Sequence, residues 1–118
     1  MSNEKKKKIL IIEDDQVIST MYKIKFTADG YDVIYADTGV KGLESAKKNK
    51  PDIILLDIIL PELDGFAILQ EIKKDSKIKK IPVIMLTNLG TEEDKKKGEK
   101  FGAADYIVKA SLTPSEVS

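Results

Sequence analysis

The 118-residue sequence contains no cysteine and no histidine, and these two absences narrow the chemistry that is open to it. Without cysteine there are no disulfides and no thiolate metal sites. Without histidine the sequence also lacks the most common general base and transition-metal ligand of proteins. Any chemistry must therefore use carboxylates, hydroxyls and lysine side chains.

Arginine is missing too, so all 20 basic residues are lysines, and 20 acidic residues balance them. A chain without net charge has no overall field that attracts nucleic acid. Lysine also lacks the bidentate fork with which arginine reads phosphate or guanine. We therefore expect no direct contact with nucleic acid. The basic run Lys5 to Lys8 is interpreted as solvated, and residues 1–7 as a flexible basic arm.

Long hydrophobic runs are absent as well, and no stretch approaches the length that crosses a bilayer. The first apolar stretch, Ile9 to Ile12, ends in three acids, which is unlike the hydrophobic region of a signal peptide. We therefore expect a cytoplasmic protein without membrane contact. The length suits one domain with a single core, so residues 1–118 are expected to form one domain.

The most informative stretch is PDIILLDIILPELDG, from Pro51 to Gly65. Its four consecutive apolar residues, Ile53 to Leu56, predict a strand that is buried on both faces, as in a parallel sheet. Asp57 follows at the exit of this strand, where open α/β sheets form their sites. Aspartate is also a common turn former, so its position alone leaves a purely structural role open.

Predicted strands and helices alternate along the whole chain. The predicted strands are residues 9–12, 32–36, 53–56, 83–87 and 103–108. Helices are predicted from about Gln16 to Ala28, after an N-cap at Thr38, after the turn at Pro61 to Gly65, and over residues 91–102. This alternation predicts a flavodoxin-like α/β fold, a doubly wound parallel sheet of five strands in the order 2-1-3-4-5.

Apolar residues at helical spacing predict the inward face of each of the first three helices. They are Val17, Met21, Ile24 and Ala28, then Val40, Leu43 and Ala46, then Phe66, Leu69 and Ile72. The fourth helix has little apolar surface beyond Phe101, and Thr91 with Asp94 resembles a capping box. We expect this polar helix to be held weakly to the sheet.

The last residues read as an incomplete element. Thr113 to Glu116 resembles a helix start, so residues 113–118 are expected to begin a fifth helix that is truncated. The sheet face near the fifth strand would then expose apolar side chains. We expect the chain to self-associate through that face.

Polar residues follow four of the five predicted strands, namely Glu13 and Asp14, Asp57, Thr87 and Lys109. At one edge of a parallel sheet these groups would converge. Neighbouring carboxylates repel one another unless a cation neutralises them, and an acidic all-oxygen pocket favours Mg²⁺. Such a site can support phosphoryl transfer to a carboxylate, with Asp57 as the nucleophile.

Four motifs in order, KILIIEDD, DIILLDIILPELDG, VIMLTN and GAADYIVKA, resemble the receiver domains of two-component response regulators, in particular the single-domain chemotaxis type. The resemblance covers Lys8 to about Leu112. It implies a phosphorylation-activated switch whose Asp57 accepts a phosphoryl group from a histidine kinase or a phosphotransfer protein. It also implies a downstream protein target that reads the surface around the fourth helix and fifth strand.

The resemblance further assigns roles to single residues. It implies that Glu13, Asp14, Asp57 and the backbone carbonyl of Ile59 hold Mg²⁺, that Thr87 and Lys109 bind the phosphoryl group, and that Tyr106 is the aromatic switch. Three departures from the family pattern concern Ala110 where proline is usual, the large Asn88, and the apolar pair Ile59 and Leu89. Because neither apolar side chain can position an attacking water, slow self-dephosphorylation is expected.

Three other functions fit the sequence less well. A Mg²⁺-dependent phosphohydrolase would need a second carboxylate near the nucleophile, where Ile59 stands. A flavodoxin-like cofactor binder would need a phosphate-binding loop after the first strand, where acids would repel the phosphate. A degenerate receiver that only mediates contacts would not need the acids and Lys109.

Overall fold

The computed structural model describes residues 7–60, 64–87 and 92–108, and for Val108 the backbone alone. Five parallel strands form one sheet in the order β2-β1-β3-β4-β5, as predicted. The strands are β1 (Lys8–Ile12), β2 (Asp32–Ala36), β3 (Ile53–Asp57), β4 (Val83–Thr87) and β5 (Asp105–Val108). The helices are α1 (Gln16–Ala28), α2 (Gly39–Asn49), α3 (Gly65–Lys74) and α4 (Glu92–Phe101).

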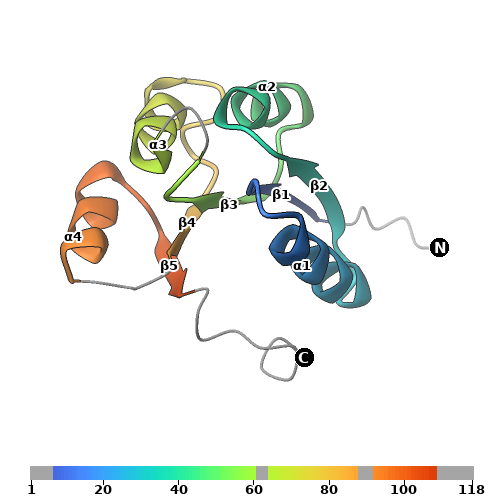
Figure 1. Cartoon of the computed structure of the whole chain (residues 1–118). Helices are drawn as coiled ribbons and strands as arrows, with labels where there is room; N and C mark the ends of the chain where they lie inside the picture. The colour runs from blue at the N-terminus through green and yellow to red at the C-terminus, as the bar shows by residue number, and fades with distance from the viewer. Residues whose placement is uncertain (1–6, 61–63, 88–91, 109–118) are drawn as a thin grey trace.

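Helices cover both faces of the sheet (Figure 1). Helix α1 lies on one face, and α2, α3 and α4 lie on the other. Two apolar clusters follow from this arrangement. One contains Leu10, Leu56 and Leu69, and the other contains Ile11, Leu55 and Tyr22. Because neighbouring residues of β1 and β3 enter different clusters, both strands are buried on both sides, which explains their unbroken apolar runs.

The N-terminal part of the sheet is longer than predicted and the C-terminal part is shorter. Lys8 opens β1, and the Lys7 carbonyl accepts a hydrogen bond from Asp32 N at 2.9 Å, so neither residue belongs to a free arm. Residues 1–6 lie outside the described ranges. Strand β5 begins at Asp105 rather than at residue 103, because Ala103 N is bonded to the Gly98 carbonyl and completes the turn after α4.

The predicted inward face of α1 is wrong, although the bounds of the helix are confirmed. Val17 is 79% exposed and Ile24 is 66% exposed, whereas Ser19 and Tyr22 are buried. The helix offers two apolar stripes, and the one that carries the rings of Tyr22 and Phe26 packs on the sheet. Aromatic side chains bury more area than valine or isoleucine, which explains why the stripe with Tyr22 and Phe26 packs on the sheet.

The inward face of α2 is also partly wrong. Val40 is 49% exposed, while Gly39, Gly42 and Ala46 are buried. Gly39 faces Ile68 of α3, and Gly42 faces Ile12 of β1. A Cβ at Gly42 would overlap the side chain of Ile12. Small residues therefore let α2 approach β1 closely, and Val40 is turned outward. The inward face of α3 is confirmed, since Phe66, Leu69 and Ile72 are all buried.

The predicted helix starts are confirmed where the structure describes them. Thr38 Oγ1 accepts a hydrogen bond from Lys41 N at 3.1 Å, and Asp15 Oδ1 accepts from Val17 N at 2.9 Å. Thr91, the turn at residues 61–63 and the expected fifth helix at 113–118 lie outside the described ranges. Within those ranges, no helix has both the length and the apolar character that crossing a membrane requires.

Candidate functional site

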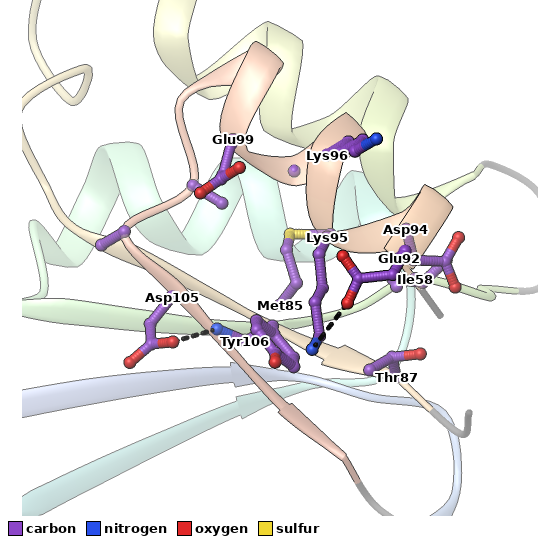
Figure 2. Close-up of a pocket in the computed structure, with 13 residues that line it drawn as sticks. Ile58, Met85, Thr87, Glu92, Asp94, Lys95, Lys96, Glu99, Asp105 and Tyr106 are labelled. Carbon is purple, nitrogen blue, oxygen red and sulfur yellow. Dashed lines mark hydrogen bonds and ion pairs between the residues drawn. The ribbon is translucent and has the colours of Figure 1, made fainter. Parts of the chain in front are cut away.

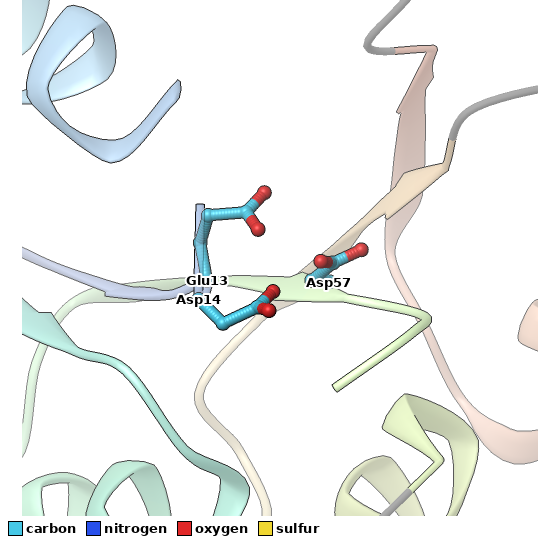
Figure 3. Close-up of side chains that lie close together, drawn as sticks. All are labelled: Glu13, Asp14 and Asp57. Atoms are coloured by element: carbon cyan, nitrogen blue, oxygen red, sulfur yellow. The ribbon is translucent and has the colours of Figure 1, made fainter. Parts of the chain in front are cut away.

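Three carboxylates meet at the carboxyl edge of the sheet (Figure 3). Glu13 and Asp14 follow β1, and Asp57 ends β3, the neighbouring strand. Each of the three offers one oxygen, and these oxygens lie within 4.8 Å of one another. Glu13 is fully buried and Asp57 is 4% exposed, whereas Asp14 is exposed. The predicted convergence of these three acids is thus present in the structure.

The backbone around the acids holds them in place. Asp15 N donates a hydrogen bond to Glu13 Oε2 at 3.1 Å, and Asp15 itself caps α1. Ile59 N donates to Asp57 Oδ1 at 3.3 Å. The loop after Asp57 is closed further by a hydrogen bond from Gly65 N to the Ile58 carbonyl at 2.6 Å. Asp57 therefore ends β3 directly before a loop that is tied to the first residue of α3.

This donor set fits a hard divalent cation. Three carboxylates within a few ångströms of one another repel each other, and burial strengthens the repulsion. Oxygen ligands without nitrogen or sulfur favour Mg²⁺ or a similar ion. Because Asp14 is exposed, the site has an open side toward solvent. The Ile59 side chain is a hydrocarbon and is 69% exposed at this edge. Only the backbone carbonyl of Ile59 could therefore join an oxygen donor set.

Thr87 ends β4 beside the carboxylates, and its side chain is 4% exposed. Asp57 pairs with Leu86 in the register of β3 and β4, so Thr87 lies one residue beyond the position opposite Asp57. Ala110, Asn88 and Leu89 lie outside the described residues, and so does Lys109, whose predicted place at the site is therefore untested.

A cavity of about 320 Å³ separates α4 from β4 and β5 (Figure 2). Thr87 and Met85 from β4 and Tyr106 from β5 line one side of it, and α4 lines the other. The Lys95 ammonium lies 4.8 Å from the centre of the Tyr106 ring and 3.4 Å from Glu92 Oε1. The Tyr106 side chain has the largest effect on the pKa of Lys95 and raises it, desolvation opposes this, and Glu92 raises it further. Lys95 therefore contacts the predicted switch residue, a role that its sequence position did not reveal.

Tyr22 is a second residue that the sequence did not single out. It lies in α1 and is 2% exposed. Burial, and then the nearby charges of Glu13 and Asp57, raise the pKa of its hydroxyl to about 12. A buried tyrosine in a helix is ordinarily a core residue, so the sequence carried no signal that its hydroxyl belongs near the acids.

The raised pKa of Tyr22 predicts a loss of stability at high pH. The unfolded chain releases the Tyr22 proton near its ordinary pKa of 10.0, whereas the folded chain keeps it to about 12. The stabilisation is therefore complete below pH 10 and is lost as the pH rises toward 12. Urea unfolding across this range should show a steeper fall for the wild type than for Tyr22→Phe. Equal slopes for the two proteins would contradict the assignment.

A family model for the response regulator receiver domain matches residues 9–116. The DNA-binding dual master transcriptional regulator RpaA of Synechocystis is 45% identical over 102 residues, which are 86% of this chain and 42% of that protein. The chain spans less than half the length of the curated relatives that it matches first.

Solved structures with the same fold include response regulators and receiver domains. The chemotaxis response regulator CheY4 of Vibrio cholerae superposes with a TM-score of 0.88 at 29% identity, covering 96% of this chain and 93% of that one. The receiver domain of the sensor histidine kinase PA1611 of Pseudomonas aeruginosa, which holds a magnesium ion in its active site cleft, has a TM-score of 0.84 at 29% identity, covering 96% and 92%. With the family model, the strand order and the relatives in agreement, the chain belongs to the receiver domains of two-component response regulators.

Proposed function

We propose that Asp57 is the phosphoacceptor of a phosphorylation-controlled switch. The observation that carries this proposal is the cluster of Glu13, Asp14 and Asp57, whose oxygens lie within 4.8 Å of one another at the edge of the sheet. Asp14 leaves the cluster open to solvent, so a phosphoryl donor has access. Receivers are signalling domains. We also propose that this chain assists its own phosphorylation.

In the proposed reaction, a carboxylate oxygen of Asp57 attacks the phosphorus of a phosphohistidine. The new O–P bond forms as the P–N bond breaks, and the imidazole of the donor keeps the electron pair. Bound Mg²⁺, held by the three carboxylates and the Ile59 carbonyl, would neutralise charge on the phosphoryl oxygens. The Thr87 hydroxyl and the Lys109 ammonium would bind the remaining oxygens.

Phosphorylation would be read on the other side of the site. Thr87 and Tyr106 line the same cavity. A shift of Thr87 toward the phosphoryl group would therefore leave space in this cavity for the Tyr106 ring. Helix α4 buries only Gly98, which supports a weak hold on the sheet. A movement of Tyr106 would break its contact with Lys95 and change the surface of α4 and β5 for a downstream protein.

The partners follow from the same chemistry. A histidine kinase or a phosphotransfer protein would supply the phosphoryl group, and the receiver would act in the cytoplasm without touching nucleic acid or membrane itself.

We propose that residues 1–118 form one such receiver domain. Self-association through the face beside β5 stays a prediction, and light scattering at high concentration tests it.

Intact mass spectrometry tests the phosphorylation directly. The chain is incubated with acetyl phosphate or phosphoramidate, with Mg²⁺ and with a chelator in its place. One phosphoryl adduct that requires the metal is the expected result. No adduct in the presence of Mg²⁺ would overturn the proposal and leave a receiver that acts only through contacts.

The phosphorylated form is expected to hydrolyse slowly. The side chain of Ile59 is apolar and 69% exposed at the edge of the site, so it cannot orient a water for attack on phosphorus. The measurement is the decay of the adduct after the donor is removed, beside Ile59→Asn, whose amide can hold a water and should shorten the lifetime. A wild-type half-life of seconds would contradict the prediction.

A further inference from the structure

The hydroxyl of Tyr22 is a buried polar group that the proposed reaction does not use. Tyr22 is 2% exposed, and among the described residues its hydroxyl has no hydrogen-bond partner. Buried hydroxyls in native proteins are almost always bonded to protein or to ordered water. The ring itself is held firmly, because it stacks on Phe26 with centroids 5.9 Å apart and planes at 14°. The hydroxyl therefore stands in a fixed place and requires a partner there.

The direction of the Tyr22 side chain follows from the helix that carries it. Side chains of an α-helix lean toward its N-terminus. Helix α1 starts at Gln16, directly after the acids that follow β1, so its N-terminus lies at the carboxyl edge of the sheet. The Tyr22 side chain accordingly extends from the middle of α1 back toward the edge at which Glu13 and Asp57 lie.

The alternation of side chains along β1 and β3 puts Tyr22 and two of the acids on the same face. Ile11 and Leu55 share an apolar cluster with Tyr22. Two residues further along an extended chain the side chain returns to the same face, and these residues are Glu13 and Asp57. The two carboxylates also raise the pKa of the Tyr22 hydroxyl, as expected for charges close to it.

We propose that Tyr22 is a positioning residue of the acidic site, whose hydroxyl donates a hydrogen bond through a buried water to the carboxylates of Glu13 and Asp57. This inference rests on the proposed function. A donor on the side of α1 favours the charged form of both acids and fixes their orientation, which the cation then uses. The water would accept from Tyr22 and donate to the two carboxylates, so all its partners are polar.

Calorimetric titration with Mg²⁺ tests the proposal on the wild type, Tyr22→Phe and Tyr31→Phe. Phenylalanine keeps the stack on Phe26 and removes only the hydroxyl. We expect Tyr22→Phe to bind Mg²⁺ about tenfold more weakly, the lower range for outer-shell partners of metal ligands. Tyr31 is the matched control, because its ring meets Phe26 edge-on at 6.0 Å on the same face of the sheet, and its removal should leave the affinity unchanged.

A second measurement on the wild type does not depend on the folding of any variant. With tyrosine labelled at 13Cζ, the Tyr22 signal should shift during the Mg²⁺ titration with the midpoint found by calorimetry, while the Tyr31 signal stays in place. The inference about Tyr22 would be overturned if the Tyr22 signal did not shift with Mg²⁺, or if a folded Tyr22→Phe bound Mg²⁺ as tightly as the wild type. Neither result would overturn the proposed function. A wild type that binds no Mg²⁺ would overturn the proposed function as well.

Discussion

Asp57→Asn should abolish the phosphoryl adduct completely, because an amide nitrogen or oxygen cannot replace the carboxylate nucleophile. Asparagine has nearly the same shape, and its amide oxygen can still accept the hydrogen bond from Ile59 N. Loss of the adduct would therefore result from the missing nucleophile and not from a change in the structure of the loop. Intact mass after incubation with acetyl phosphate and Mg²⁺ gives the result as the presence or absence of one adduct.

Asp64→Asn is the matched control for this experiment. Asp64 lies on the same loop, is exposed, and caps α3 through a hydrogen bond from Phe66 N to Oδ1 at 2.8 Å. Asparagine is as good an N-cap as aspartate, so this variant should fold and accept the phosphoryl group like the wild type. An adduct that persists in Asp57→Asn would place the phosphoacceptor elsewhere.

The same substitution has an expected effect on stability in the absence of metal. Glu13 and Asp57 are buried, and Asp14 lies beside them, so three negative charges crowd one edge of the sheet. Removing one charge relieves this repulsion. Asp57→Asn should thus unfold at a higher temperature than the wild type without metal, and should gain less than the wild type when Mg²⁺ is added.

The convergence of the acids was predictable from the sequence because it depends on topology alone. Short apolar runs ending in Glu13 and Asp57 predict parallel strands, and parallel strands that are neighbours end at one edge. No side-chain detail enters that argument. The strand order was predictable from the alternation of strands and helices along the chain. The helix bounds and the N-caps were predictable because they follow from local patterns.

Helix faces and side-chain directions were harder to predict from the sequence. Val17 and Ile24 fit an inward stripe as well as Ile18, Tyr22 and Phe26 do, and only the packing on the sheet decides between the two stripes. The place of the Tyr22 hydroxyl depends on that packing and on the alternation of side chains along two strands. The contact of Lys95 with Tyr106 likewise joins a helix to a strand, so no spacing within either element reveals it.

Gly65→Ala is expected to destabilise both the fold and the site. A Cβ at this buried position would overlap the backbone carbonyl of Asp57 and the Cα of Ile58, which cannot turn aside as a flexible side chain would. Overpacking of this kind costs about 1–3 kcal/mol of unfolding free energy. The start of α3 and the loop after Asp57 would have to separate, and the hydrogen bond from Gly65 N to the Ile58 carbonyl would weaken.

The consequence for the site distinguishes this variant from an ordinary packing defect. The backbone that has to move includes the end of β3 at Asp57 and the loop with the Ile59 carbonyl, which are two of the proposed Mg²⁺ ligands. Mg²⁺ affinity and phosphorylation should therefore fall even under conditions where the variant is fully folded. Urea unfolding measures the loss of stability in Gly65→Ala, and calorimetric titration with Mg²⁺ measures the loss of affinity.

Gly98→Ala in α4 is the control, because there a Cβ would find ordinary contacts, the nearest being 3.6 Å from Ala103 Cβ. Alanine in a helix interior is more favourable than glycine by roughly 0.5–1 kcal/mol, so this variant should be more stable than the wild type, with unchanged Mg²⁺ affinity. The two glycines thus predict opposite signs for the same substitution. If Gly65→Ala matched Gly98→Ala in stability and in Mg²⁺ affinity, the close approach of α3 to the backbone of Asp57 would not be what holds the site together.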